Sequence, residues 1–250
     1  MTEYAPVSII GADRPADWIV LCDHATNIVP DFIAEGCLGL PVEDMARHIA
    51  WDPGALGVTQ AMAEAFDGPA IHSNFSRLVI DPNRADDDPT LVRKIYDGSI
   101  IPGNRHADAD EVQRRIDLLY RPYHDGLRAL IDARLAAGRT PRLISIHSFT
   151  PQLIDEPPRP WELGLLWDKD DRIFRPLMDR LAHEPLTVGD NEPYSGALSG
   201  DCMWMHGTSR GIPHLLIEVR NDLIETSDQQ VSWGKKLARW LTEAMELAES

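Results

Sequence analysis

The sequence is poor in cysteine and contains no long apolar stretch. Among its 250 residues the only cysteines are Cys22, Cys37 and Cys202, and no two of them form a Cys-x-x-Cys pair. No disulfide framework is expected, and without an apolar segment behind a basic N-terminus the expected compartment is the reducing cytoplasm. Unbroken apolar runs reach about five residues, whereas a membrane helix needs about 20. We therefore expect no membrane partner.

Basic residues are scarce relative to acidic ones. The chain has 24 Lys and Arg against 40 Asp and Glu, which gives a formal net charge of −16. Nucleic acids and anionic membranes bind clustered positive charge, so neither is expected as a partner. A small anionic ligand fits this composition better, because a few arginines can line a local pocket inside an acidic protein.

Several familiar catalytic motifs are also absent. The chain has no phosphate-binding loop ending in Gly-Lys-Ser/Thr and no Gly-x-Gly-x-x-Gly sequence. Residues 207–211 read Gly-Thr-Ser-Arg-Gly and match the serine nucleophile motif, but that motif lies between a strand and a helix. Here a polar loop precedes the serine and a predicted strand follows it, so we interpret the match as chance.

Short apolar runs alternate with longer helical patterns along the chain. Strands are predicted over 18–22, 70–73, 78–81, 143–147, 163–167, 186–188 and 214–219. Helices are predicted over 108–137, 171–182 and 227–247, with a broken helical pattern over 41–66. No linker or repeat divides the sequence. We predict a single α/β domain over 1–250, with a mixed, mostly parallel sheet flanked by helices.

Residues able to do chemistry follow three of these predicted strands. Asp23 and His24 follow strand 18–22, His147 ends strand 143–147, and Glu218 lies near the end of strand 214–219. Ligands of open α/β sheets bind beyond the carboxyl ends of the strands. Two histidines and a glutamate at one sheet edge are typical of a mononuclear metal hydrolase. The alternative is that each side chain only caps its own strand through hydrogen bonds.

The sequence leaves the third metal ligand open. The His-x-x-Glu ligand pair of many zinc peptidases is absent, because Asn27 stands three residues after His24 and an amide is a poor zinc ligand. His48 and Asp52 are four residues apart and would share one face of an unbroken helix. Asp52 is therefore either a ligand or the N-cap of a helix whose first residue is Pro53.

A group of arginine and amide side chains surrounds Asp81 in the sequence. Its members are Arg77, Asn83, Arg84, Asn104 and Arg105. The planar guanidinium of arginine matches the two oxygens of a carboxylate, and a dicarboxylate substrate would need two such partners. We expect these residues to bind substrate carboxylates. The alternative is that Asp81 pairs with Arg77 or Arg84 and only fixes the loop.

Several blocks together resemble the N-formylglutamate amidohydrolase family over most of the chain. They are Asp-His-Ala at 23–25, Arg-Leu-Val-Ile-Asp-Pro-Asn-Arg at 77–84, Ile-Pro-Gly-Asn-Arg at 101–105, Ser-Ile-His-Ser-Phe at 145–149, Asn-Glu-Pro-Tyr-Ser-Gly at 191–196 and Gly-Ile-Pro-His at 211–214 with Ile-Glu-Val-Arg at 217–220. The resemblance implies a zinc-dependent amide hydrolase with a fold similar to zinc carboxypeptidases and aspartoacylase-like enzymes. The family's namesake removes formate from N-formyl-L-glutamate in histidine breakdown.

Carried over by position, the resemblance makes His24 and His147 metal ligands and Glu218 the catalytic carboxylate. Our working hypothesis adds Asp52 as third ligand to zinc or another divalent metal, and Arg220 or Arg84 as stabiliser of the oxyanion. The substrate is then a small anionic N-acyl amino acid. Two rival hypotheses are a related hydrolase of another N-acyl amino acid or small amide, and a non-catalytic metal- or anion-binding protein with the same fold.

Overall fold

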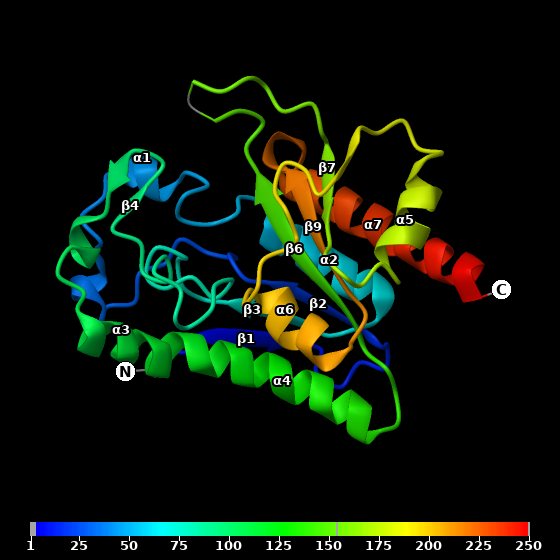
Figure 1. Ribbon diagram of the computed structural model, residues 1–250, viewed down its shortest axis with the longest axis horizontal. Coiled ribbons are helices and arrows are strands. Elements are labelled where there is room, and N and C mark those ends of the chain that lie inside the picture. Colours follow the sequence, from blue (N-terminus) through cyan, green and yellow to red (C-terminus); the bar gives the residue numbers. More distant parts are fainter. Residues whose placement is uncertain (1–3, 154, 250) are drawn as a thin grey trace.

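The computed structural model describes residues 4–153 and 155–249, and a seven-stranded sheet forms its centre (Figure 1). In spatial order the strands are β1 (Val7–Ile10), β3 (Ala70–Ser73), β2 (Trp18–Cys22), β6 (Arg142–Phe149), β9 (His214–Arg220), β7 (Leu163–Leu166) and β8 (Val188–Asp190). Strands β3, β2, β6 and β9 are parallel, whereas β1 and β7 pair antiparallel with β3 and β9. The prediction of an α/β fold with a mixed, mostly parallel sheet is confirmed.

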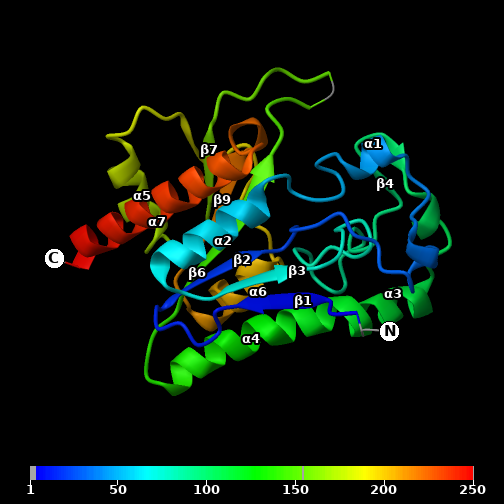
Figure 2. The ribbon, with the colours of Figure 1, turned by 180° about the vertical axis from the view of Figure 1, so that it is seen from behind.

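Helices cover both faces of this sheet (Figures 1 and 2). One face packs against α2 (Ala55–Phe66), α5 (Phe174–Leu181) and α7 (Ser227–Glu249), and the other against α4 (Arg121–Ala136) and α6 (Cys202–His206). Within β2, Val20 and Cys22 join the first of these cores, while Ile19 and Leu21 join the second. Because every residue of β2 is buried, its apolar run needs no alternation with polar residues.

The remaining elements lie in the long connections. They are α1 (Val42–Met45), the β4–β5 hairpin (Ile95–Tyr96 and Ser99–Ile100), α3 (Ala109–Arg115) and four short 3-10 turns at Ala34–Gly36, Pro102–Asn104, Thr208–Arg210 and Asn221–Leu223. A π-helical turn, Ile116–Tyr120, joins α3 to α4, so the helix predicted over 108–137 is one nearly unbroken segment. Of the described helices, none is both long and apolar enough to cross a membrane.

The prediction of a strand over 78–81 is wrong, because this segment is a buried turn. Its carbonyl oxygens pair with side chains instead of a neighbouring strand. The carbonyl of Leu78 accepts a hydrogen bond from Asn104 Nδ2, and that of Val79 accepts one from Arg115 Nη1. The apolar run is buried here in a separate small core, which satisfies the same pattern without sheet pairing.

Of the two alternatives for Asp52, the N-cap role is also wrong. Helix α2 begins at Ala55, and its N-cap is Gly54 with a positive φ of 81°. A Cβ at this position would lie 2.4 Å from the carbonyl oxygen of Ile224, so only glycine fits the approach. Pro53 therefore lies before the helix, and the Asp52 side chain is free to turn toward the sheet edge. Two smaller differences concern strands, since β1 was not predicted and β8 covers Val188–Asp190 in place of 186–188.

Candidate active site

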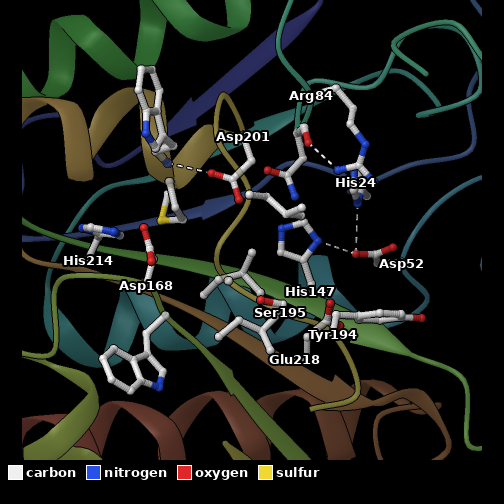
Figure 3. Close-up of a pocket in the computed structure, with 18 of the residues that line it drawn as sticks. His24, Asp52, Arg84, His147, Asp168, Tyr194, Ser195, Asp201, His214 and Glu218 are labelled. Atoms are coloured by element: carbon white, nitrogen blue, oxygen red, sulfur yellow. Dashed lines mark hydrogen bonds and ion pairs between the residues drawn. The ribbon is translucent and has the colours of Figure 1, made fainter. Parts of the chain in front are cut away.

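Three neighbouring parallel strands place candidate residues at one edge of the sheet (Figure 3). β2 leads directly into Asp23 and His24, while β6 and β9 carry His147 and Glu218, which are paired in register. All four residues are nearly inaccessible to solvent. The prediction from the sequence is that these side chains lie at one edge of the sheet. The sheet order β2-β6-β9 explains why they do.

His24, Asp52 and His147 form a compact cluster. Asp52 Oδ2 lies 3.2 Å from His24 Nδ1 and 2.8 Å from His147 Nδ1. The cluster offers two imidazole nitrogens and one carboxylate oxygen within 4.8 Å of one another. This donor set is one that binds zinc in hydrolases.

The outer nitrogen of each histidine faces a further carboxylate. His24 Nε2 lies 2.7 Å from Asp81 Oδ1, and His147 Nε2 lies 3.0 Å from Asp23 Oδ2. Metal-binding histidines commonly donate their second N–H to a carboxylate in this way, which fixes the ring and its tautomer. A neutral ring that donates from Nε2 has a lone pair on Nδ1, so both inner lone pairs would face the Asp52 carboxylate. Either extra protons or a cation must separate these groups, and the residues therefore fit a metal ion.

The pKa shifts of His147 and Asp52 agree with a cation between these groups. Burial alone would lower the pKa of His147, but hydrogen bonds and charge interactions with Asp23 and Asp52 outweigh it and raise that pKa well above its usual value. Burial would likewise raise the pKa of Asp52, yet His24 and His147 hold it far below its usual value. Without a metal, a proton on His147 therefore occupies the position that suits a cation.

Arg77 is engaged by the carboxylates of the site. Its Nη2 donates to Asp81 Oδ2 at 2.9 Å, and its Nη1 lies 3.5 Å from Asp52 Oδ1. Its guanidinium is thus committed to neutralising two carboxylates, which is the alternative that the sequence left open for Arg77.

Glu218 has the opposite environment from these paired carboxylates. Its side chain is buried, and its Oε2 has no hydrogen-bond partner among the described residues. Burial raises the pKa of Glu218 to about 7, although the nearby His147 opposes the shift. A carboxylate that titrates near neutral pH is suited to accept and return a proton during a reaction.

A cavity of about 290 Å³ opens over the cluster. Asn83 and Arg84 line it beside the histidines, and Arg84 Nη1 donates to the Asn83 carbonyl at 2.7 Å. Within the described part of the chain, Arg84 forms no ion pair with a carboxylate, unlike Arg77. Arg84 is therefore the guanidinium of this cavity that is available to an anionic ligand.

The cavity is lined by aromatic and apolar side chains as well as polar ones. Trp167, Tyr194 and Trp204 contribute to its wall together with Leu166, Leu198, Met203 and Leu216. Asp168 and His214 also line the cavity, and Tyr194 is drawn beside Glu218 and His147 (Figure 3). The cavity therefore combines the polar histidine cluster with bulky apolar side chains in its wall.

Three predicted site residues do not line this cavity. Arg220 donates to Asp222 Oδ1 and to the Trp161 carbonyl. Asn104 Nδ2 donates to the carbonyls of Leu78 and Arg93 and its Oδ1 accepts from Arg115, while Arg105 is exposed. These side chains stabilise loops or face solvent, so the structure separates them from the histidine cluster. Asn27 does not line the cavity either, and its amide donates to the Met45 carbonyl.

Sequence reasoning missed two features of the site. It did not identify Asp23 and Asp81 as carboxylate partners of the two histidines, although Asp23 directly precedes His24. It also did not predict the burial of His124, which is 4% exposed and stacks on His206. The spacing of Cys202 and His206, four residues apart, could have indicated a shared helix face.

Comparisons with known proteins agree with the geometry. The family model for N-formylglutamate amidohydrolase matches residues 16–225. The structure of gene product Atu2144 from Agrobacterium tumefaciens is 33% identical, with a TM-score of 0.93 over 98% of this chain and 96% of that one. No curated protein matches the chain.

Two more distant structures share the fold. N-formylglutamate amidohydrolase from Ralstonia eutropha JMP134 is 19% identical, with a TM-score of 0.67 over 96% of this chain and 99% of that one. A bacteriophage poly-gamma-glutamate hydrolase is 9% identical, with a TM-score of 0.50 over 100% and 92% of the two chains. With the family model matching most of its length, the chain belongs to the N-formylglutamate amidohydrolase family.

Proposed function

We propose that the protein is a metal-dependent amidohydrolase that cleaves the amide bond of an N-formyl or other N-acyl amino acid. The observation that supports metal dependence is the pair of inner histidine nitrogens on Asp52, each ring held from outside by a carboxylate. His24, Asp52 and His147 would hold the ion, and zinc suits this donor set. When bound, it would supply a Lewis acid that polarises the carbonyl and makes water easier to ionise.

Glu218 is the proposed proton carrier. Its free Oε2 accepts a proton from the water as the oxygen attacks the acyl carbon. The same carboxyl group then donates this proton to the departing amine, so that the products are a carboxylic acid, formate for a formyl group, and the free amino acid. Its pKa of about 7 makes both transfers accessible near neutral pH.

Arg84 and Asn83 are the proposed recognition residues for the substrate α-carboxylate. Arg84 lacks an ion pair within the described residues, and Asn83 Oδ1 already accepts from the Cys202 N–H, which leaves its amide group to donate. Arg77 keeps the metal-site carboxylates charged and ordered. The free cysteines and the small cavity fit our proposal of a cytoplasmic protein that acts on small substrates.

N-formyl-L-glutamate is the first candidate substrate, because the family includes enzymes for it. One observation favours a second candidate, an N-acyl amino acid with a large apolar or aromatic side chain. A dicarboxylate needs two cationic partners, yet Arg77 is already paired with carboxylates and several aromatic side chains line the cavity.

A substrate panel with the zinc-loaded protein tests this proposal. Formyl, acetyl and succinyl derivatives of glutamate, methionine and phenylalanine are compared by released amine. Hydrolysis that needs added zinc and stops on chelation supports the proposal. Zinc binding without hydrolysis of any panel member would favour the non-catalytic alternative.

A further inference from the structure

A second group of metal-ligand side chains lies outside the cavity of the proposed active site. It comprises His124 from α4 and Cys202 and His206 from α6, which we call the His-Cys-His cluster. All three side chains are at least 96% buried. One ligand atom from each lies within 4.8 Å of the other two. Cys202 and His206 are separated by four positions, so one turn of helix brings both to the same side.

The two imidazole rings are stacked, and a nitrogen atom of one lies close to a nitrogen atom of the other. They stack with centroids 5.2 Å apart and an angle of 10° between their planes. His124 Nδ1 lies 2.9 Å from His206 Nε2, so a single proton is shared between two neutral rings. Among the described residues, His124 Nε2, on the other side of its ring, has no hydrogen-bond partner. This nitrogen is free to carry the shared proton when a metal ion takes its place.

Protonation does not compete strongly for these nitrogens. Burial lowers the pKa of His124 to about 3 and that of His206 to about 4. The adjacent ring, Arg128 and Arg210 act in the same direction, while Asp23, Asp132 and the Pro82 carbonyl oppose it. Both rings are therefore neutral at physiological pH, which is the form that binds metals.

The third donor is a thiol with its proton still attached. Burial and the nearby Asp23 and Asp201 raise the pKa of Cys202 well above its usual value. A metal ion must therefore displace this proton, as thiolate ligation generally requires. The cluster itself contains no carboxylate, so its donors are softer than those around Asp52.

We propose that the His-Cys-His cluster binds one transition-metal ion of the zinc class through two imidazole nitrogens and the Cys202 sulfur. Binding releases the thiol proton to solvent, and the proton between the rings moves to the other nitrogen of its own ring. Three protein ligands leave a fourth position open. This inference concerns residues that the proposed hydrolysis does not use, and it holds whether or not that proposal is correct.

A route from solvent leads to the cluster. His124 and His206 line a second cavity of about 430 Å³, whose other walls include Arg121, Asp125 and Arg128. The proposed active-site cavity contains neither histidine, and Trp204 contributes to both walls. An ion can therefore reach the cluster from the α4 side of the molecule without passing the proposed catalytic residues.

Cobalt(II) titration of the chelator-treated full-length protein provides the test. Cobalt bound to a thiolate gives a near-ultraviolet charge-transfer band, and the His24–Asp52–His147 cluster contains no sulfur that could produce it. We expect the wild type to show this band and to bind one more ion than Cys202→Ser, which should lack the band. His147→Ala should keep the band, and Cys37→Ser, which changes an exposed cysteine, is the matched control.

Absence of the band in the folded wild type would overturn the proposal, as would a band that survives in Cys202→Ser. If Cys202→Ser fails to fold, His124→Gln serves instead, because it removes one nitrogen donor and keeps the thiol. A folded His124→Gln protein, checked by circular dichroism, should bind cobalt at this position at least tenfold more weakly. Unchanged affinity in that variant would also contradict the site.

Discussion

The two histidine clusters of this protein have the same burial and opposite electrostatics. His147 is 3% exposed and His206 is 3% exposed, yet the pKa of the first is raised and that of the second is lowered to about 4. Burial lowers both values. The difference comes from two carboxylates, Asp23 and Asp52, which hydrogen-bond the ring of His147, whereas no described carboxylate hydrogen-bonds the ring of His206. The neighbours of a buried histidine therefore decide its charge.

The two clusters also meet at one residue. Asp23 faces His147 through Oδ2, accepts a hydrogen bond from Tyr123 through Oδ1, and hydrogen-bonds the Cys202 thiol. Asp81, the equivalent partner of His24, faces only the first cluster. Substitutions at these two carboxylates can thus separate effects on one cluster from effects on both.

The largest expected effect is that of His147→Ala. Removing one of two imidazole donors should abolish tight metal binding at the proposed active site and reduce hydrolysis to background. Metal analysis and amine release measure the two effects on the same sample. His183→Ala, which changes an exposed histidine, should affect neither. Full hydrolysis by metal-free His147→Ala protein would end the metal-dependent proposal.

Glu218→Gln should lower kcat by about 10²–10⁴-fold, because the amide cannot take the proton from water. Metal content should stay unchanged, since Glu218 is outside the set of metal donors. In the wild type, kcat/KM should rise with pH through about 7 as Glu218 loses its proton and becomes a base. A Glu218→Gln protein with wild-type kcat would exclude this role.

Asp23→Asn should weaken metal binding at the proposed active site by roughly 10–100-fold, because the amide holds the His147 ring less firmly. The same variant should alter the cobalt–thiolate band of the His-Cys-His cluster. Asp81→Asn is the matched substitution and should weaken only the first site. Equal effects of both variants on the band would show that Asp23 has no special link to Cys202.

The smallest effect concerns acid stability of the metal-free protein. His206 has a folded pKa of about 4, below its ordinary value of 6.5, so the unfolded chain binds more protons between these values. Stability should therefore fall as the pH drops from about 6.5 toward 4. His206→Gln should reduce this loss by roughly 1–2 kcal/mol at pH 5, measured by urea unfolding. His147 adds no slope over this range, because its raised folded pKa makes its contribution constant below 6.5. A wild-type pH slope retained in His206→Gln would contradict the lowered pKa.

The parts of the site that lie at strand ends were predictable from the sequence. Apolar runs before His24, His147 and Glu218 define central strands, and parallel strands bring their carboxyl ends to one edge. The loop residues were not predictable in the same way. Asp52 depends on the late start of α2 at Ala55, and the role of Arg77 depends on which carboxylate it meets after folding.

The His-Cys-His cluster shows another limit of sequence patterns. His124 lies within an amphipathic helix whose spacing alone does not show how far its buried face extends. The ring of His124 is buried because α6 packs against α4 and the π-helical turn. The contact between His124 and His206 joins positions 82 residues apart in the sequence. The short helix of Cys202 and His206 lies inside a long polar loop, where periodicity gives little signal.

The position of the proposed active site on β2, β6 and β9 has a consequence for motion. These are interior strands of the sheet, and the backbone amides of such strands generally exchange with solvent only when the whole domain opens. His24, His147 and Glu218 are thus anchored to the slowest-exchanging part of the molecule, whereas Asp52 lies in the loop before α2. The aromatic wall is attached differently, because Tyr194 and Trp204 belong to the connection between β8 and β9. Backbone amides of β2, β6 and β9 should therefore exchange slowly, and those of the β8–β9 connection should exchange faster. The aromatic wall can then move to admit substrate without disturbing the groups that act on it.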